Sequence, residues 1–137
     1  MIRQQLNAES LNEIYTVALL LTGSRRRAEA SVTESLRQLT ESDVRCESLQ
    51  ATFLQRTVSA ALDGPQYWEQ DLGLPAELQR VVALPVRLRH SFVLRFLQSM
   101  PLEQCAKLLR LRPEQVTDNA LAAVRAMAGV MVREQAA

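Results

Sequence analysis

The segment that decides the fold is residues 84–127, which read LPVRLRHSFVLRFLQSMPLEQCAKLLRLRPEQVTDNALAAVRAM. In its middle part, apolar residues recur at the spacing of a helix with one buried face: Leu102, Cys105, Ala106, Leu108 and Leu109. Pro101 suits the first turn of this helix, where no N–H is needed. A second helix begins at Pro113 and continues to Met127. Because only residues 110–112 separate the two, the segment predicts a helix-turn-helix.

The turn and the facing surfaces decide how closely these two helices approach. Ala106 has a small side chain that lets the second helix come near, and Val116 and Ala120 supply the facing surface. Leu111 is expected to point back inward. Arg110 must either adopt a left-handed conformation at some cost or reshape the turn.

The whole segment resembles region 4 of the extracytoplasmic-function sigma factors, through residues 84–89, 92–97 and 101–106 in the family's order. In that family the module holds the promoter's upstream element with its last helix and packs on RNA polymerase. Family members usually carry a glycine in the turn, where this chain has Arg110. The resemblance implies DNA contacts by six residues in and after the turn: Arg110, Arg112, Gln115, Thr117, Asn119 and Arg125.

The charge of the second helix predicts weak DNA binding. The family's helix is usually basic just after its valine, whereas Asp118 and Asn119 follow Val116 here. Asp118 would repel phosphates, and Arg125 is the only cation on the helix. Asn119 and Gln115 could still read adenine edges. The segment carries six cations that no acid but Glu103 interrupts: Arg87, Arg89, Arg95, Lys107, Arg110 and Arg112. A cluster of this kind is as often a set of long side chains that cover exposed helix faces as a surface for phosphates.

Three helices are predicted in the first half of the chain. They span residues 9–21, 25–40 and about 49–62. Ser10 is the expected N-cap of the first, with Glu13 completing a capping box. Gly23 ends that helix in a left-handed conformation, and Ser24 caps the next. Residues 40–47 are polar and predict a loop.

The first half resembles region 2 of the same sigma family. The matching positions are Tyr15, Ala18, Leu19, residues 21–23, Ala28, Glu29, Val32, Glu34 and Leu36. In the family, the second helix docks on the clamp helices of the polymerase largest subunit. The resemblance therefore implies polymerase contacts by Glu29, Thr33 and Glu34, with Thr33 standing where the family usually has a glutamine.

The third helix resembles the one with which family members open and read the downstream promoter element. Phe53 stands at the usual tryptophan and Arg56 is kept, but Ser59 and Ala60 replace a basic-polar pair. Residues 63–65 then stop the helix where a basic tail would begin. We expect impaired promoter opening, because few cations and aromatics remain to hold a melted strand.

The chain is predicted to be all-α, with two small modules joined by a linker. Residues 1–63 form the region 2-like module, residues 64–77 the linker and residues 78–137 the helix-turn-helix module. Tyr67 and Trp68 in the linker predict a docking contact, either with the chain's own modules or with a partner.

Charge is distributed unevenly along the 137 residues. The net charge is +1, but residues 1–78 carry 7 basic and 11 acidic side chains, against 9 and 4 in residues 79–137. This asymmetry fits a basic module that faces DNA or an acidic partner, joined to an acidic module that faces protein. No apolar run is long enough to span a membrane and no secretion signal is recognised, so we expect a cytoplasmic protein.

No enzyme, metal site or cofactor is expected. Cys46 and Cys105 are too few for a disulfide framework, and His90 is expected at the surface with no second ligand for a metal. No nucleophile elbow or glycine-rich phosphate loop is present. Glu29 and Glu34 lie five residues apart on a helix and diverge. The run Arg25, Arg26 and Arg27 is expected to be a solvated first turn.

Three functions remain open. The favoured one is a short, divergent sigma factor that binds RNA polymerase core and promoter DNA. The second is a sigma mimic that keeps the shape, has lost DNA contacts and binds an anti-sigma factor or another helical partner. The third is a helical dimerisation domain. The sequence does not reveal the oligomeric state.

Overall fold

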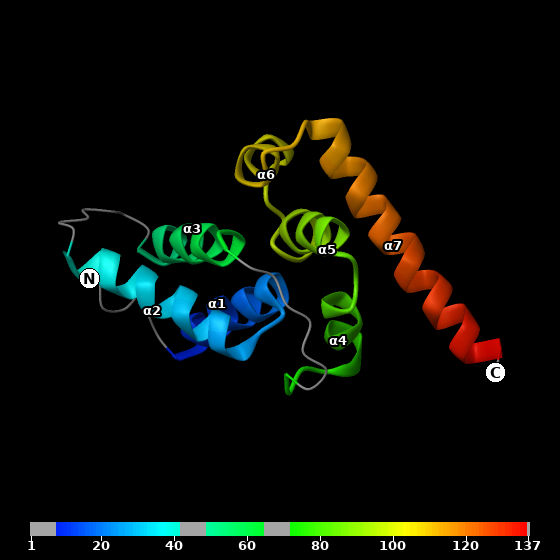
Figure 1. The fold of residues 1–137 in the computed structure, drawn as a ribbon, viewed down its shortest axis with the longest axis horizontal. Helices are drawn as coiled ribbons and strands as arrows, with labels where there is room; N and C mark the ends of the chain where they lie inside the picture. Colours follow the sequence, from blue (N-terminus) through cyan, green and yellow to red (C-terminus); the bar gives the residue numbers. More distant parts are fainter. Residues whose placement is uncertain (1–7, 42–48, 65–71, 137) are drawn as a thin grey trace. The chain divides into compact units, whose positions relative to one another are not determined.

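The protein is all-α in the computed structural model, which describes residues 8–41, 49–64 and 72–136. No strand occurs among these residues, and the predicted fold class is confirmed (Figure 1). The chain divides into two compact units, Met1–Leu72 and Gly73–Ala137, each described by itself below. None of the described helices is long and apolar enough to cross a membrane.

The first unit is a three-helix bundle in which each helix packs against the other two. Its helices are α1 (Ala8–Thr22), α2 (Arg25–Glu41) and α3 (Leu49–Leu62), close to the predicted spans. The core contains fully buried apolar side chains from all three: Ile14, Leu21, Ala28, Phe53, Val58 and Ala61. The predicted loop lies outside the described residues from residue 42 on, as do Tyr67 and Trp68.

The turn between α1 and α2 is closed by hydrogen bonds within a few residues. Gly23 has a φ of 68°, and the Ser24 hydroxyl oxygen accepts a hydrogen bond from the Arg27 N–H at 3.3 Å. Both predicted roles are confirmed, since glycine tolerates the left-handed conformation and Ser24 satisfies an orphan donor of α2. The predicted N-cap Ser10 is wrong. It lies inside α1 and is buried, because the helix begins at Ala8.

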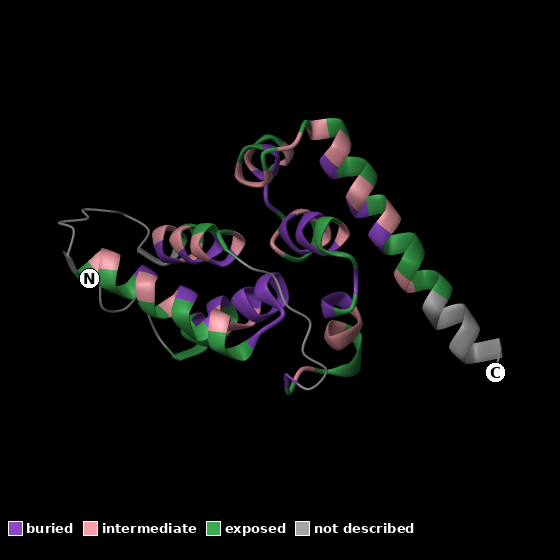
Figure 2. Ribbon diagram, viewed as in Figure 1, coloured by how far each residue is buried: buried purple, intermediate pink, exposed green. Residues whose placement is uncertain are grey.

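The second unit is built around α7. Its elements are α4 (Ala76–Val82), α5 (Val86–Phe92), the π-helical η2 (Val93–Leu97), α6 (Leu102–Leu109) and α7 (Pro113–Ala136). Helix α7 packs on both α5 and α6. The apolar core includes Val81, Val82, Val93, Leu94, Cys105, Val116, Ala120 and Ala123 (Figure 2). Ala106, Val116 and Ala120 are buried as predicted.

Two polar residues of α5 lie inside this core, contrary to the sequence analysis. Arg89 is only 1% exposed, and its Nη1 donates a hydrogen bond to the Val82 carbonyl at 2.9 Å, which ties α5 to the end of α4. Burial lowers the pKa of Arg89. His90 was expected at the surface and is instead buried. Helix α7 packs on α5, and the sequence of α5 by itself does not indicate which of its side chains such packing will bury.

Candidate functional site

The turn between α6 and α7 has a fixed backbone conformation. Arg110 adopts φ 57° and ψ 43°, the left-handed conformation that was one of its two expected alternatives. The Leu111 N–H donates to the Ala106 carbonyl at 3.0 Å, and the Arg110 N–H donates to the Lys107 carbonyl at 3.3 Å. This pair of hydrogen bonds is the Schellman closure of a helix C-terminus. The turn is therefore formed despite the absence of a glycine.

The beginning of α7 is closed from the other side by Gln115. Its Oε1 accepts a hydrogen bond from the Arg112 N–H at 3.0 Å, while the Arg112 carbonyl accepts from the Val116 N–H at 3.1 Å. This is one half of a capping box. A bidentate contact with adenine uses both the oxygen and the nitrogen of a glutamine amide. Gln115 would have to release the Arg112 N–H to make that contact.

Exposed cations surround this turn. Lys107, Arg110 and Arg112 are exposed, and Arg87 is exposed on α5. Arg95, by contrast, is half-buried, and its Nη1 donates to the Met100 carbonyl at 2.9 Å. Together with the burial of Arg89, this leaves Lys107, Arg110 and Arg112 as the cations at the turn.

The exposed face of α7 is acidic and apolar rather than basic. Its exposed residues between positions 114 and 125 are Glu114, Thr117, Asp118, Leu121, Val124 and Arg125. Leu121 and Val124 are each 42% exposed. Asn119 is half-buried and lies about 100° around the helix from Asp118, outside this face. Of the predicted DNA contacts on α7, Thr117 and Arg125 therefore share the exposed face with Asp118.

The predicted polymerase contacts on α2 divide between two faces. Glu29 and Thr33 are exposed one turn apart, whereas Glu34 is half-buried and lies toward α3. The Glu34 carboxylate accepts hydrogen bonds from Arg37 Nε at 2.9 Å and from Gln38 Nε2 at 3.2 Å. These hydrogen bonds hold the pKa of Glu34 below its ordinary value of 4.5, with the Arg37 bond as the larger cause.

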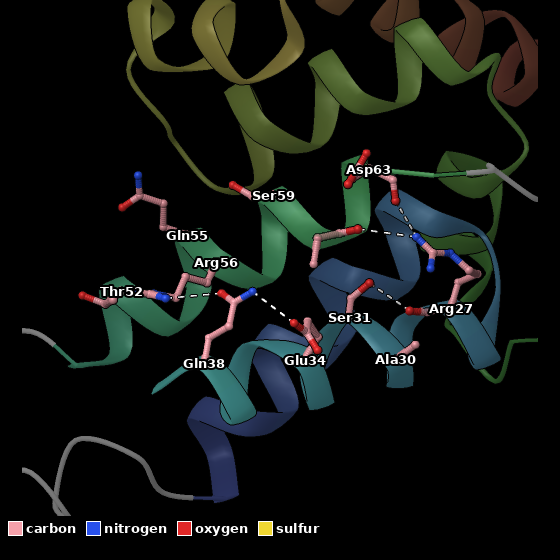
Figure 3. Close-up of a pocket in the computed structure, with 11 residues that line it drawn as sticks. Arg27, Ala30, Ser31, Glu34, Gln38, Thr52, Gln55, Arg56, Ser59 and Asp63 are labelled. Carbon is pink, nitrogen blue, oxygen red and sulfur yellow. Dashed lines mark hydrogen bonds between the residues drawn. The ribbon is translucent and has the colours of Figure 1, made fainter. Parts of the chain in front are cut away.

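A polar groove of about 770 Å³ lies between α2 and α3 (Figure 3). In this groove Arg56 Nη1 donates to Gln38 Oε1 at 3.3 Å, so α3 is linked through Gln38 to Glu34. The sequence analysis did not find Gln38, because its partners come from two helices and no motif marks them.

Arg27 closes the other end of the groove. Its Nη2 donates to the Asp63 carbonyl at 2.6 Å and to the Ala60 carbonyl at 3.4 Å, so it caps the C-terminus of α3 (Figure 3). Arg27 was expected to be solvated with Arg25 and Arg26, and this expectation is wrong for Arg27, which is half-buried. The contact joins residues that are 36 positions apart, and no local sequence pattern predicts a hydrogen bond between residues so distant in the chain.

Comparison of the chain with protein-family models, curated proteins and solved structures finds no match. Within residues 8–41, 49–64 and 72–136, no three His, Cys, Asp or Glu side chains form a group that could hold a metal ion.

Proposed function

We propose that this chain is a sigma-factor-like transcription protein, in which the second unit binds promoter DNA and α2 binds RNA polymerase core. The proposal combines the two sequence resemblances with one structural observation. Arg110 and Arg112 are exposed on either side of Leu111, in a turn whose backbone is closed by the Schellman bonds and the Gln115 cap. A rigid turn that presents cations is suited to contact phosphates at defined positions.

In this proposal the residues of the turn provide DNA affinity through phosphate contacts, and the residues of α7 recognise the bases. Lys107, Arg110 and Arg112 would neutralise phosphates, since all three are exposed. Thr117, Asn119 and Arg125 would approach base edges from α7, and Gln115 would join them only if its cap opened. Asp118 on the exposed face opposes phosphate approach, so the DNA affinity is low and depends strongly on salt.

Glu29 and Thr33 are the proposed contacts with polymerase. Their exposure on one face of α2 leaves them accessible to a partner helix. Glu34 is not proposed as a direct contact with polymerase, because its carboxylate is already held by Arg37 and Gln38.

The test is a DNA titration at low salt, followed by fluorescence anisotropy, together with capture of RNA polymerase core on the immobilised chain. We expect binding in both assays. Three phosphate contacts give log K a slope of roughly −2.7 against log salt. The variant R110A/R112A should lose most of the DNA binding and about two thirds of that slope. Absence of both DNA and polymerase binding would refute the proposal.

The second candidate is a sigma mimic that binds an anti-sigma factor or another helical protein. It is favoured by the face of α7, where Glu114 and Asp118 are exposed and Arg125 is the only cation among residues 114–125. Asp118→Arg distinguishes the two candidates. If that single change converts a chain that does not bind DNA into one that does, the wild-type face is built for protein rather than for DNA.

A further inference from the structure

We propose that the exposed face of α7 pairs with the same face of a second copy of this chain, with the two helices antiparallel. This inference goes beyond the proposed function, because it concerns a protein partner. The paired face includes Thr117 and Arg125, so the dimer and the proposed DNA contacts of α7 are alternative states that exclude each other. The face consists of Thr117, Asp118, Leu121, Val124 and Arg125, and is called the α7 face below.

The residues of the α7 face lie on one side of the helix. At 100° per residue, they fall within an arc of about 120°. Opposite them lie Val116, Ala120 and Ala123, which are at most 1% exposed and form the core with α5 and α6. The α7 face therefore points away from the unit's own core.

The centre of the α7 face is apolar. Leu121 and Val124 are each 42% exposed, and they are neighbours on the helix surface because they are three positions apart in the sequence. No described residue of the second unit covers them. An aliphatic pair on a long helix is the usual centre of a helix–helix contact.

The charges at the two ends of the α7 face identify the partner as a second copy. Asp118 lies before the apolar pair and Arg125 after it, seven residues apart, which is about 10.5 Å along the helix axis. Neither side chain forms an ion pair within the described residues. The two are too far apart along one helix to pair with each other.

A two-fold axis near residue 122 brings these charges together. Asp118 of one copy then lies beside Arg125 of the second copy, and the same pair forms again by symmetry. Leu121 of one copy lies against Val124 of the other in the same register. A parallel pairing in register would instead place Asp118 against Asp118 and Arg125 against Arg125, which is unfavourable. The α7 face is thus self-complementary in the antiparallel direction only.

The test is the oligomeric state of the full chain, measured by sedimentation equilibrium over a wide range of protein concentrations. We expect a reversible dimer. Asp118→Arg alone puts two arginines side by side at both symmetry-related contacts of the dimer, and Arg125→Asp alone puts two aspartates there. Each single variant should weaken the dimer by about tenfold or more. The double variant D118R/R125D should restore the dimer, because each contact between positions 118 and 125 again joins one positive and one negative side chain.

Matched controls separate this pairing from general effects. Glu103→Arg on the exposed surface of α6 makes the same change in net charge as Asp118→Arg and should leave the dimer unchanged. Leu121→Ser should weaken the dimer, whereas Leu11→Ser, at a leucine that is 37% exposed in the first unit, should not. Helical circular dichroism of every variant verifies that it is folded.

A native chain that is monomeric at every concentration would overturn the proposal. So would a dimer that persists in both single charge reversals, or a double reversal that is folded and remains monomeric. A dimer that depends on Leu11 but not on Leu121 would also overturn it, since the contact would then lie in the first unit.

Discussion

At the scale of single residues, Arg110 shows how a turn can form with an unfavourable side chain. A left-handed conformation costs a residue with a Cβ roughly 1–2 kcal/mol relative to the right-handed one, and glycine avoids this cost. Arg110 nevertheless adopts φ 57°, because the Schellman bonds and the short connection to α7 require it. Retaining arginine there places a cation at the turn at the expense of stability.

We predict that Arg110→Gly stabilises the second unit by about 1 kcal/mol, since the left-handed strain is removed. The measurement is the free energy of unfolding from denaturant titration. Arg110→Ala is the matched control, because it removes the same charge and keeps the Cβ. Equal stabilities of the glycine and alanine variants would contradict the strain at this position.

The lowered pKa of Glu34 leads to a second prediction at the scale of single residues. Its pKa lies below 4.5 in the folded chain, so unfolding is accompanied by proton uptake as the pH falls. The stabilising contribution is therefore complete above pH 4.5 and disappears as the pH falls through the lower, folded-state pKa. Glu34→Gln should flatten the dependence of the unfolding free energy on pH below pH 4.5, measured by denaturant titration at a series of pH values. An unchanged dependence in the folded variant would show that the Arg37 and Gln38 hydrogen bonds do not hold the carboxylate.

At the scale of helices, the C-terminus of α3 is stabilised by a side chain from another helix. Arg27 of α2 donates to the carbonyls of Ala60 and Asp63, at the end of α3 where the last carbonyls of a helix have no N–H ahead of them in the helix. Gly64 follows at φ 109°, and a Cβ on it would lie 2.9 Å from Arg27 Nη2. The start of α2 and the end of α3 are therefore in close contact through the Arg27 side chain.

We predict that Arg27→Met destabilises the first unit by roughly 1–3 kcal/mol, because two carbonyls lose a charged donor. The measurement is thermal or denaturant unfolding. Arg26→Met, at an exposed position one residue earlier, is the control and should change the stability little. If both variants were equally stable, the Arg27 cap would contribute nothing.

At the scale of the whole molecule, the proposed binding functions belong to separate units. The residues proposed to contact polymerase lie in Met1–Leu72 and those proposed to contact DNA lie in Gly73–Ala137, and each unit has its own apolar core. The acidic character of the first half and the basic character of the second agree with this division.

We predict that the two functions can be removed one at a time. E29Q/T33A should lower polymerase capture by about tenfold, an effect of 1.4 kcal/mol, and leave DNA affinity unchanged. R110A/R112A should do the opposite. Measuring both assays on both variants checks this, and a loss of both functions in either folded variant would contradict separate sites.

The sequence by itself determined the helices and the local closures of their turns. The α3 boundaries, the Gly23 turn and the Ser24 cap followed from periodicity and from hydrogen bonds within four residues, and such short-range interactions are encoded where they occur. For Arg110 the sequence left two alternatives, a left-handed conformation or a reshaped turn, and the structure has the first. DNA and polymerase binding remain predictions from the resemblance.

Only the tertiary structure decided which side chains those helices bury and which they join. Arg89 and His90 entered the core, Arg27 reached the end of α3, and Glu34 turned toward the groove rather than to the face of Glu29. The physical reason is the same in each case. Burial and long-range hydrogen bonds depend on which helices lie opposite a residue, and that information is absent from the residue's own neighbourhood in the chain.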